Sequence, residues 1–305
     1  MPLDLNYDEI CAKFDRLLSN GIVNYQPSKP ILVVDGGMTF SFHLVESLRT
    51  KPQAEDVPET KSCLTNGANT QPMSFGPGSD IANDHPDLCI TTVNGTHYLV
   101  INRFPVIRPM LLLLTVDSYR RQYEPLDLED IEAAWNTICG LKEEHYAFFN
   151  CTVIAGSSRE HKHLQIIPAP GKREGYVEGF KLFPDDDTAP KMGPSFVHFL
   201  QRFEDPPEAC VKNGEHMLEI YQRPLQQARE ALELPTGHVP CPHNFVFTRR
   251  WMVVIPRRAK EINGIAANTA GMMGSVYIWS HDQLDAWKET GPMKVLAGLG
   301  LSREE

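Results

Sequence analysis

One stretch decides the fold, because it runs from a small-residue loop into a strand: Ala155-Gly156-Ser157-Ser158-Arg159-Glu160-His161-Lys162-His163-Leu164-Gln165-Ile166-Ile167-Pro168. From His163 onward polar and apolar residues alternate, which predicts a β-strand with Leu164 and Ile166 on its core side. Side chains two residues apart share a face of a strand. We therefore expect His161, His163 and Gln165 to point the same way, directly after the loop.

These residue types suit phosphate chemistry. Gly156, Ser157 and Ser158 favour a loop that brings backbone N–H groups and hydroxyls close to phosphate oxygens. A neutral imidazole is a good nucleophile near pH 7 when an acceptor holds one ring nitrogen and the other faces phosphorus. A glutamine amide can donate a hydrogen bond to the phosphoryl oxygen as charge develops. The pattern predicts a nucleotide-phosphate site in which His163 attacks phosphorus and Gln165 binds a phosphoryl group.

Two other interpretations of the histidines stay open at this point, namely a surface pair and a metal site. A zinc site needs a third or fourth ligand. His97 and His145 are available, but they lack the spacing of a zinc motif. We therefore predict no resident metal, although a divalent cation such as Mg²⁺ is compatible with a nucleotide substrate.

Helical and strand periodicities continue on both sides of this stretch. Helices are predicted over residues 4–20, over 127–141 with Asp127 as N-cap, across 195–234, over 281–288 and from Met293. Strands are predicted over 97–104, 111–116 and 146–150, and as a hairpin of 244–248 with 251–255. Polar stretches rich in Pro and Gly cover 50–87 and 169–194, and the first is expected to be a mobile surface loop or lid.

Bulk composition narrows the functional class. The 305 residues carry a net charge of −10, which disfavours non-specific nucleic-acid binding. The seven cysteines are odd in number and none are spaced as C-x-x-C, so a reducing compartment is expected. No apolar run approaches the roughly 20 residues that span a bilayer. We expect a cytoplasmic protein without a membrane partner, with nuclear residence also open.

The sequence resembles the histidine-triad superfamily, in the branch of galactose-1-phosphate uridylyltransferase, and within it the fungal diadenosine tetraphosphate phosphorylase family, also called ATP adenylyltransferases. The His-x-His-x-Gln motif after a Gly/Ser loop carries the resemblance. Further matching segments follow the same order along most of the chain: Leu48-Arg49-Thr50-Lys51-Pro52, Asn102-Arg103-Phe104-Pro105-Val106, Phe148-Phe149-Asn150, Thr248-Arg249-Arg250-Trp251-Met252 through Pro256-Arg257-Arg258, Gly264-Ile265-Ala266-Ala267-Asn268 and Gly291-Pro292-Met293.

The resemblance implies an α+β fold, with a histidine-triad-like antiparallel sheet flanked by helices and long polar insertions. It implies one catalytic domain over residues 1–305, in which residues 240–305 complete the sheet. His163 would attack the α-phosphorus of an adenosine polyphosphate, and inorganic phosphate would take the adenylyl group to give ADP. His161 would orient the site, and the remaining roles are phosphate binding by Lys51, Gly156, Ser157, Ser158 and Gln165, and nucleoside binding by Asn102, Arg103, Phe104 and Asn150.

Two alternatives share these residues. One is a family paralogue with altered chemistry, such as a hydrolase or an enzyme of secondary metabolism. The other is a non-catalytic nucleotide-binding protein. Residues 152–155 (Thr-Val-Ile-Ala) are more apolar than the family's loop, and Met110 stands where a histidine is expected. Adenine nucleotides and phosphate are the expected partners in the main interpretation.

Overall fold

The computed structural model describes residues 3–46, 48, 75–81, 85–171, 175–186, 193–203, 214–237 and 239–303. Lys51 and most of the polar insertion predicted over 50–87 therefore lie outside the described residues. Within the described ranges, no helix combines the length and the hydrophobicity that crossing a membrane requires.

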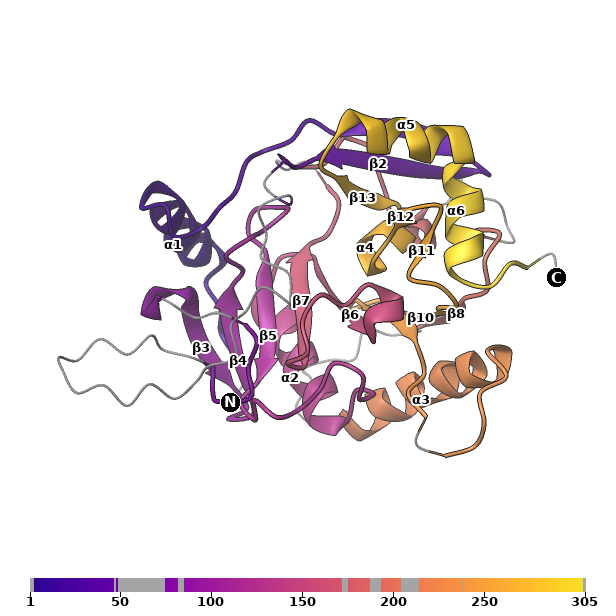
Figure 1. Cartoon of the computed structure of the whole chain (residues 1–305). Helices are drawn as coiled ribbons and strands as arrows, with labels where there is room; N and C mark the ends of the chain where they lie inside the picture. The colour runs from indigo at the N-terminus through magenta and orange to yellow at the C-terminus, as the bar shows by residue number, and fades with distance from the viewer. Residues whose placement is uncertain are drawn as a thin grey trace, which may run out of the picture.

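An eight-stranded sheet forms the centre of the molecule (Figure 1), and every pair of neighbouring strands in it is antiparallel. The α+β prediction with an antiparallel sheet is thus confirmed. β7, the predicted histidine strand, lies between β5 and β6. The strands, in spatial order, are β3 (Cys89–Val93), β4 (His97–Ile101), β5 (Leu111–Thr115), β7 (His163–Pro168), β6 (His145–Cys151), β9 (His243–Phe247), β10 (Trp251–Pro256) and β8 (Phe199–Arg202).

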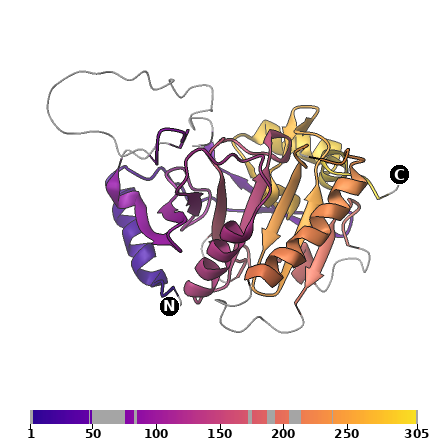
Figure 2. The same cartoon turned by 90° about the horizontal axis from the view of Figure 1, so that it is seen from below.

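Three helices cover one face of this sheet, α1 (Tyr7–Ser19), α2 (Leu128–Gly140) and α3 (Gly214–Ala231), and Figure 2 shows them from below. They share one hydrophobic core with Leu164 and Ile166 of β7. Trp135 of α2, 2% exposed, stacks on Phe247 with ring centroids 5.2 Å apart. Burying a side chain of this kind contributes about 1.5–3 kcal/mol. The alternation along β7 therefore fixes which of its faces meets the helices.

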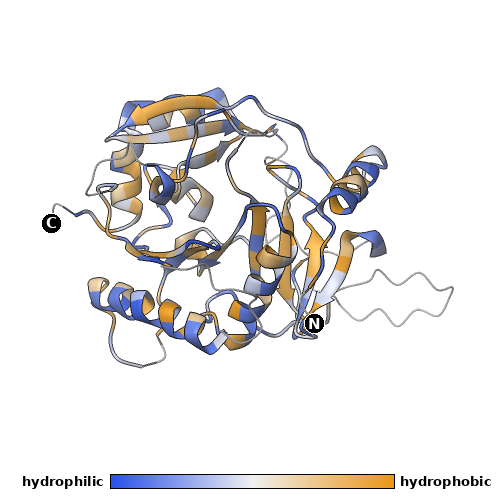
Figure 3. Cartoon of the chain, turned by 180° about the vertical axis from the view of Figure 1, so that it is seen from behind, coloured by the Kyte–Doolittle hydropathy of each residue, from blue (hydrophilic) through white to orange (hydrophobic). Residues whose placement is uncertain are grey.

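A smaller sheet covers part of the opposite face. Its strands are β1 (Ile31–Asp35), β2 (Met38–Leu44) and β13 (Ser275–Ile278), in the order β1-β2-β13. Helices α4 (Thr269–Met272), α5 (His281–Thr290) and α6 (Pro292–Leu299) and the short pair β11 (Glu261–Ile262) and β12 (Ile265–Ala266) lie beside it. Phe42 meets Trp287 in the core shared with β6 and β10. Figure 3 shows the apolar colouring of the strands and the mixed colouring of α3.

A third hydrophobic cluster lies next to the small sheet, on the face of β4 and β5 that is opposite the three helices. In it Phe75 packs with Val100, Leu112 and Leu114. Leu112 is the register partner of Gln165, and Gln165 is the partner of Phe148. Register partners point to the same side of a sheet. Gln165 therefore lies on the face that carries the small sheet and Phe75, opposite the three helices.

Several predicted elements are confirmed, and others are corrected. The helices near 4–20, 127–141, 281–288 and after Met293 are present, and Asp127 caps α2 in a capping box with Asp130. The helical prediction across 195–234 is wrong in its first part, because β8 occupies Phe199–Arg202 and α3 begins only at Gly214. β4 ends at Ile101, so Asn102 and Phe104 belong to a turn. β1, β2, β3 and β13 were not predicted, nor were the 3₁₀ turns Pro86–Leu88, Val153–Ala155 and Phe183–Asp185.

Candidate active site

His163 opens β7 and is held there through its backbone. Its N–H donates to Oε1 of Gln122 at 2.8 Å, and its carbonyl accepts from Nε2 of the same side chain at 3.0 Å. The imidazole is 6% exposed, and its Nδ1 lies 2.8 Å from the carbonyl oxygen of His161. A carbonyl oxygen only accepts, so Nδ1 carries the proton in this arrangement. In a neutral ring the lone pair is then on Nε2, the atom that a nucleophilic role requires.

His161 precedes the strand and has both ring nitrogens engaged. Nε2 lies 2.9 Å from the backbone oxygen of Thr115, so it carries the proton, and Nδ1 accepts from the hydroxyl of Ser79 at 2.8 Å. Burial lowers the pKa of His161 below its ordinary value, which favours the neutral ring. His161 is thereby suited to hold its own carbonyl in place for His163. This geometry fits the orienting role that the motif suggested.

Ser79 and Asp80, far away in sequence, bind the start of the His161–Gln165 motif through hydrogen bonds. Asp80 accepts from the backbone N–H of Glu160 at 2.8 Å and from that of His161 at 3.0 Å, one bond to each carboxylate oxygen. Ser79, its neighbour, is the residue that meets the His161 ring. Part of the predicted insertion therefore packs against the motif. Some 80 residues separate the two segments, so no local pattern could have revealed the contact.

The Gly/Ser loop folds back on itself before it reaches His161. The N–H groups of Gly156 and Ser157 donate to the carbonyls of Val153 and Thr152, at 3.0 and 3.2 Å. These two N–H groups therefore have partners within the loop, and the phosphate-binding role of Gly156 stays a prediction. Gly156 instead permits close packing, because its φ is +91° and an added Cβ would lie 2.8 Å from Cα of Asn268. The hydroxyl of Ser157 donates to Arg159 O at 2.7 Å, and Ser158 is exposed.

Asn150 lies beneath this loop. Its side-chain oxygen accepts from Nδ2 of Asn244 at 3.1 Å, and from the N–H and hydroxyl of Thr269 at 2.8 and 2.7 Å. The residue is 2% exposed. Three hydrogen bonds to one oxygen make Asn150 an anchor for the loop, and its contact with a nucleoside stays a prediction. Arg257 joins the same buried network through Asn244.

Asn102, Arg103 and Phe104 form a turn at the far end of the strands from His163. Asn102 accepts from the Phe104 N–H at 2.9 Å, and the Arg103 guanidinium lies 5.7 Å from the Phe104 ring centroid. The pairings place Ile101, which precedes this turn, in line with Ile166 of β7, three residues beyond His163. That is about 10 Å at about 3.3 Å per residue. Arg103 and Phe104 therefore lie beyond the opposite end of this stretch of β7 from His163.

A buried ion pair lies on the helix side of β7. Nζ of Lys162 is 2.6 Å from Asp130 and 2.7 Å from Pro125 O, and Nε2 of His97 lies 3.1 Å from the second oxygen of Asp130. Burial would raise the pKa of Asp130, but the hydrogen bond from His97 and the Lys162 ammonium hold that pKa well below its usual range. The pair ties the motif to the N-terminus of α2. Neither Lys162 nor Asp130 was singled out in the sequence for this role.

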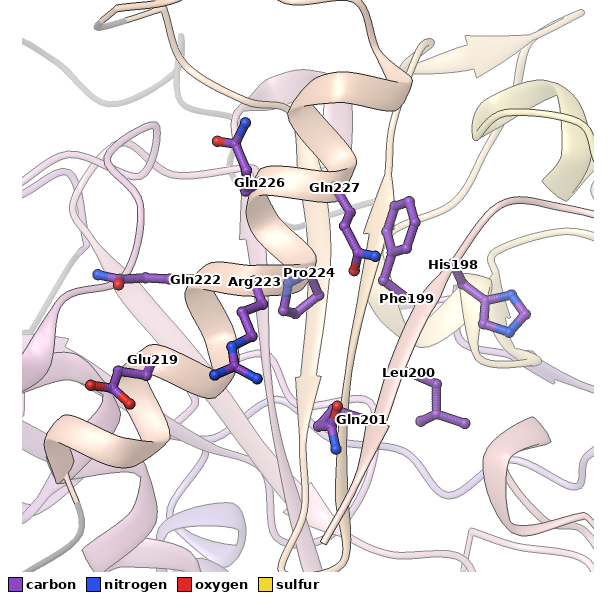
Figure 4. Close-up of a pocket in the computed structure, with 10 residues that line it drawn as sticks. All are labelled: His198, Phe199, Leu200, Gln201, Glu219, Gln222, Arg223, Pro224, Gln226 and Gln227. Atoms are coloured by element: carbon purple, nitrogen blue, oxygen red, sulfur yellow. The ribbon is translucent and has the colours of Figure 1, made fainter.

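Among the described residues, no cluster of three or more His, Cys, Asp or Glu side chains is arranged to hold a metal ion. A groove of about 950 Å³ lies between α3 and β8 (Figure 4), with Arg223 on one side and Leu200 on the other. β8 is four strands away from β7 in the sheet order, or about 19 Å. The groove, which His198 lines, is therefore separate from His161 and His163.

Comparison with protein families gives two matches that together span most of the chain. Residues 7–177 match the Ap4A phosphorylase N-terminal domain, and residues 193–302 match the ATP adenylyltransferase C-terminal domain. Two relatives come from Saccharomyces cerevisiae. Diadenosine 5',5'''-P1,P4-tetraphosphate phosphorylase 2 is 26% identical over 67% of this chain and 70% of its own length, and Protein APA1 is 28% identical over 88% and 84%.

Solved structures show the same fold. The crystal structure of yeast Ap4A phosphorylase Apa2 superposes with a TM-score of 0.74 at 22% identity, covering 99% of this chain and 96% of that one. The crystal structure of Apa2 in complex with Ap4A gives a TM-score of 0.73 at 21% identity, covering 99% of both chains.

Proposed function

The chain belongs to the Ap4A phosphorylase family, and on that premise we propose that it cleaves diadenosine tetraphosphate with inorganic phosphate to ADP and ATP through an adenylyl-His163 intermediate. The observation that carries the proposal is the 2.8 Å contact from Nδ1 of His163 to the His161 carbonyl. It directs the lone pair of a neutral ring to Nε2.

The first step forms a bond between Nε2 of His163 and the α-phosphorus. The bond from that phosphorus to its bridging oxygen breaks, and its electron pair leaves with ATP. The adenylylated ring keeps its Nδ1 proton and becomes positively charged. The His161 carbonyl, already 2.8 Å away, stabilises that charge. Gln165, on the same face of β7, would donate its amide N–H to the phosphoryl oxygen.

In the second step an oxygen of inorganic phosphate attacks the adenylyl phosphorus. The phosphorus–nitrogen bond breaks and its electron pair returns to Nε2, giving ADP and neutral His163. His163 neither gains nor loses a proton in either step, so the fixed Nδ1 proton suits both directions. The reverse direction would join ADP and ATP into the dinucleotide.

We propose that both matched segments make one catalytic unit. β9, from the C-terminal segment, pairs with β6 of the N-terminal one, and Asn244 of β9 bonds to Asn150 of β6. Arg103 and Phe104 would lie near the nucleoside and Ser157 and Ser158 near the phosphates. Lys51 would reach the same phosphates, as the family resemblance implies.

The products identify the reaction. We expect incubation with diadenosine tetraphosphate to give ADP and ATP only when inorganic phosphate is present, measured by anion-exchange chromatography. AMP and ATP formed without phosphate would indicate a hydrolase instead. Tight adenine-nucleotide binding without turnover would indicate a nucleotide sensor. Either result would refute the proposed reaction.

Substitution of Asp80 tests whether its hydrogen bonds to the backbone of Glu160 and His161 support catalysis. We expect Asp80→Ala to lower kcat/KM by about 10-fold to 100-fold, because the His161 backbone loses an acceptor and displacements of about 1 Å are costly in catalysis. Asp80→Asn keeps one acceptor oxygen, so its kcat/KM should lie between the values of Asp80→Ala and the wild type. Asp87→Ala, on the 3₁₀ turn Pro86–Leu88 of the same insertion, is the matched control. Equal kcat/KM for Asp80→Ala and the control would show that the hydrogen bonds of Asp80 do not contribute to catalysis.

A further inference from the structure

Arg257 is a buried cation held by neutral groups. It follows the last residue of β10 and is 1% exposed. Its guanidinium donates five hydrogen bonds, four to backbone carbonyls and one to a carboxamide. The acceptors are Leu299 O (3.2 Å), Ala259 O (3.0 Å), Ala267 O (2.9 Å), Ala155 O (3.4 Å) and Oδ1 of Asn244 (2.7 Å).

Among the described residues, the charge of Arg257 therefore lacks a compensating carboxylate. Across the part of the chain that the structure describes, no Asp or Glu forms an ion pair with it. Burial lowers the pKa of Arg257 to about 10, so the side chain stays protonated at neutral pH. Buried charges in proteins are usually paired. Lys162, equally buried, has Asp130, which makes the unpaired state of Arg257 unusual within this same molecule.

The position of this charge is directly behind the Gly/Ser loop. Nη1 bonds to the carbonyl of Ala155, the residue before Gly156, and to Asn244, which itself donates to the Ala155 carbonyl at 2.8 Å. Nη1 also bonds to Ala267 O, and Gly156 packs against the next residue, Asn268. The loop thus rests on a layer that contains one uncompensated positive charge. A charge in a water-excluded layer acts over longer distances than one in solvent.

We propose that Arg257 is an electrostatic positioning residue of the loop, and that the polyphosphate of the substrate is its missing counter-charge. The inference rests on the proposed function, because it assumes that phosphates bind at this loop. Arg257 does not touch the substrate. It holds the loop carbonyls by hydrogen bonds and adds a fixed positive potential that favours ligands in proportion to their negative charge.

The test compares charge-changing variants with ligands of graded charge. Arg257→Lys keeps the charge, whereas Arg257→Gln and Arg257→Met remove it, and the methionine fills the space of the stem without polar atoms. Adenosine, AMP and ATP are titrated by calorimetry into the full chain carrying His163→Ala, which prevents turnover. For both neutral variants we expect ATP affinity to fall about tenfold, equivalent to about 1.4 kcal/mol, AMP affinity to fall less, and adenosine affinity to stay unchanged. Arg257→Lys should retain most of its ATP affinity.

The ratio of ATP affinity to adenosine affinity, compared within one variant, distinguishes an electrostatic effect from damage to the fold. A purely structural role for Arg257 predicts that adenosine and ATP lose affinity by the same factor, or that the lysine variant loses as much as the glutamine variant. Either result would overturn the inference. If one neutral variant fails to fold, the other gives the same ratio. Turnover of diadenosine tetraphosphate by the wild type tests the proposed function separately, so a failure of the inference can be distinguished from a failure of the proposed function.

Discussion

His163→Ala is expected to abolish phosphate-dependent cleavage of diadenosine tetraphosphate, with kcat reduced by at least about 10⁴-fold. Removing the nucleophile of a covalent mechanism typically lowers kcat by this factor or more. The substrate would still bind, because the loop and its supporting network do not depend on this imidazole. We therefore expect ATP affinity to change little while kcat collapses, as measured by steady-state kinetics and calorimetry.

The covalent intermediate gives a second measurement for the same variant. With substrate and without phosphate, wild-type protein should gain one adenylyl group, detected by intact mass spectrometry and located on His163 by peptide mapping. Phosphate should remove the group and release ADP. His161→Ala is the matched control, since its ring touches Thr115 and Ser79, and it should slow adduct formation while leaving the adduct on His163. An adduct on His163→Ala, or none on turning-over wild type, would contradict the nucleophile assignment.

The elements nearest to the motif could be predicted because their signals are local. The alternation of β7 and the capping pattern of α2 are short-range properties, and the structure has both. The small sheet was not predicted, because β1 is largely exposed and β13 has only four residues. The four residues of β8 precede the periodic pattern of α3, and that pattern extends the helical prediction over them. Short strands depend on their partners for stability, so their own sequences carry little signal.

In the candidate site, too, local features could be predicted from the sequence and long-range contacts could not. His161, His163 and Gln165 are adjacent in sequence, and the family resemblance carries their roles. Their supports are not adjacent: Gln122 holds the His163 backbone from 41 residues away, and Asp80 holds His161 from 81 residues away. Asn150, predicted to lie near the nucleoside, also has a supporting role that the sequence does not indicate, because its side chain binds Thr269. The residues proposed for chemistry are close together in the sequence, whereas the residues that fix their geometry come together only in the fold.

Lys162→Met is expected to cause the largest loss of stability, about 3–5 kcal/mol in the free energy of unfolding, as broken buried ion pairs typically do. Methionine retains the volume of the stem but leaves the Asp130 carboxylate buried without its ammonium partner. Both side chains are 0% exposed and lie 2.6 Å apart. Urea unfolding at neutral pH measures the change. Lys142→Met is the matched control, because Lys142 and Asp4 are 73% and 80% exposed, and exposed pairs contribute about 0–1 kcal/mol.

The dependence on pH identifies Asp130 as the origin of this loss. Its pKa in the folded protein is held below the ordinary value, so its ion pair stabilises the fold above the unfolded pKa of about 3.9 and loses that effect as pH falls further. The gap between wild type and Lys162→Met should therefore be widest above about pH 4 and narrow on further acidification. Asp130→Asn combined with Lys162→Met should be less damaging than the sum of the single changes. Additive losses with a pH-independent gap would mean that Lys162 stabilises the motif through its hydrogen bond to Pro125 O and not through its ion pair with Asp130.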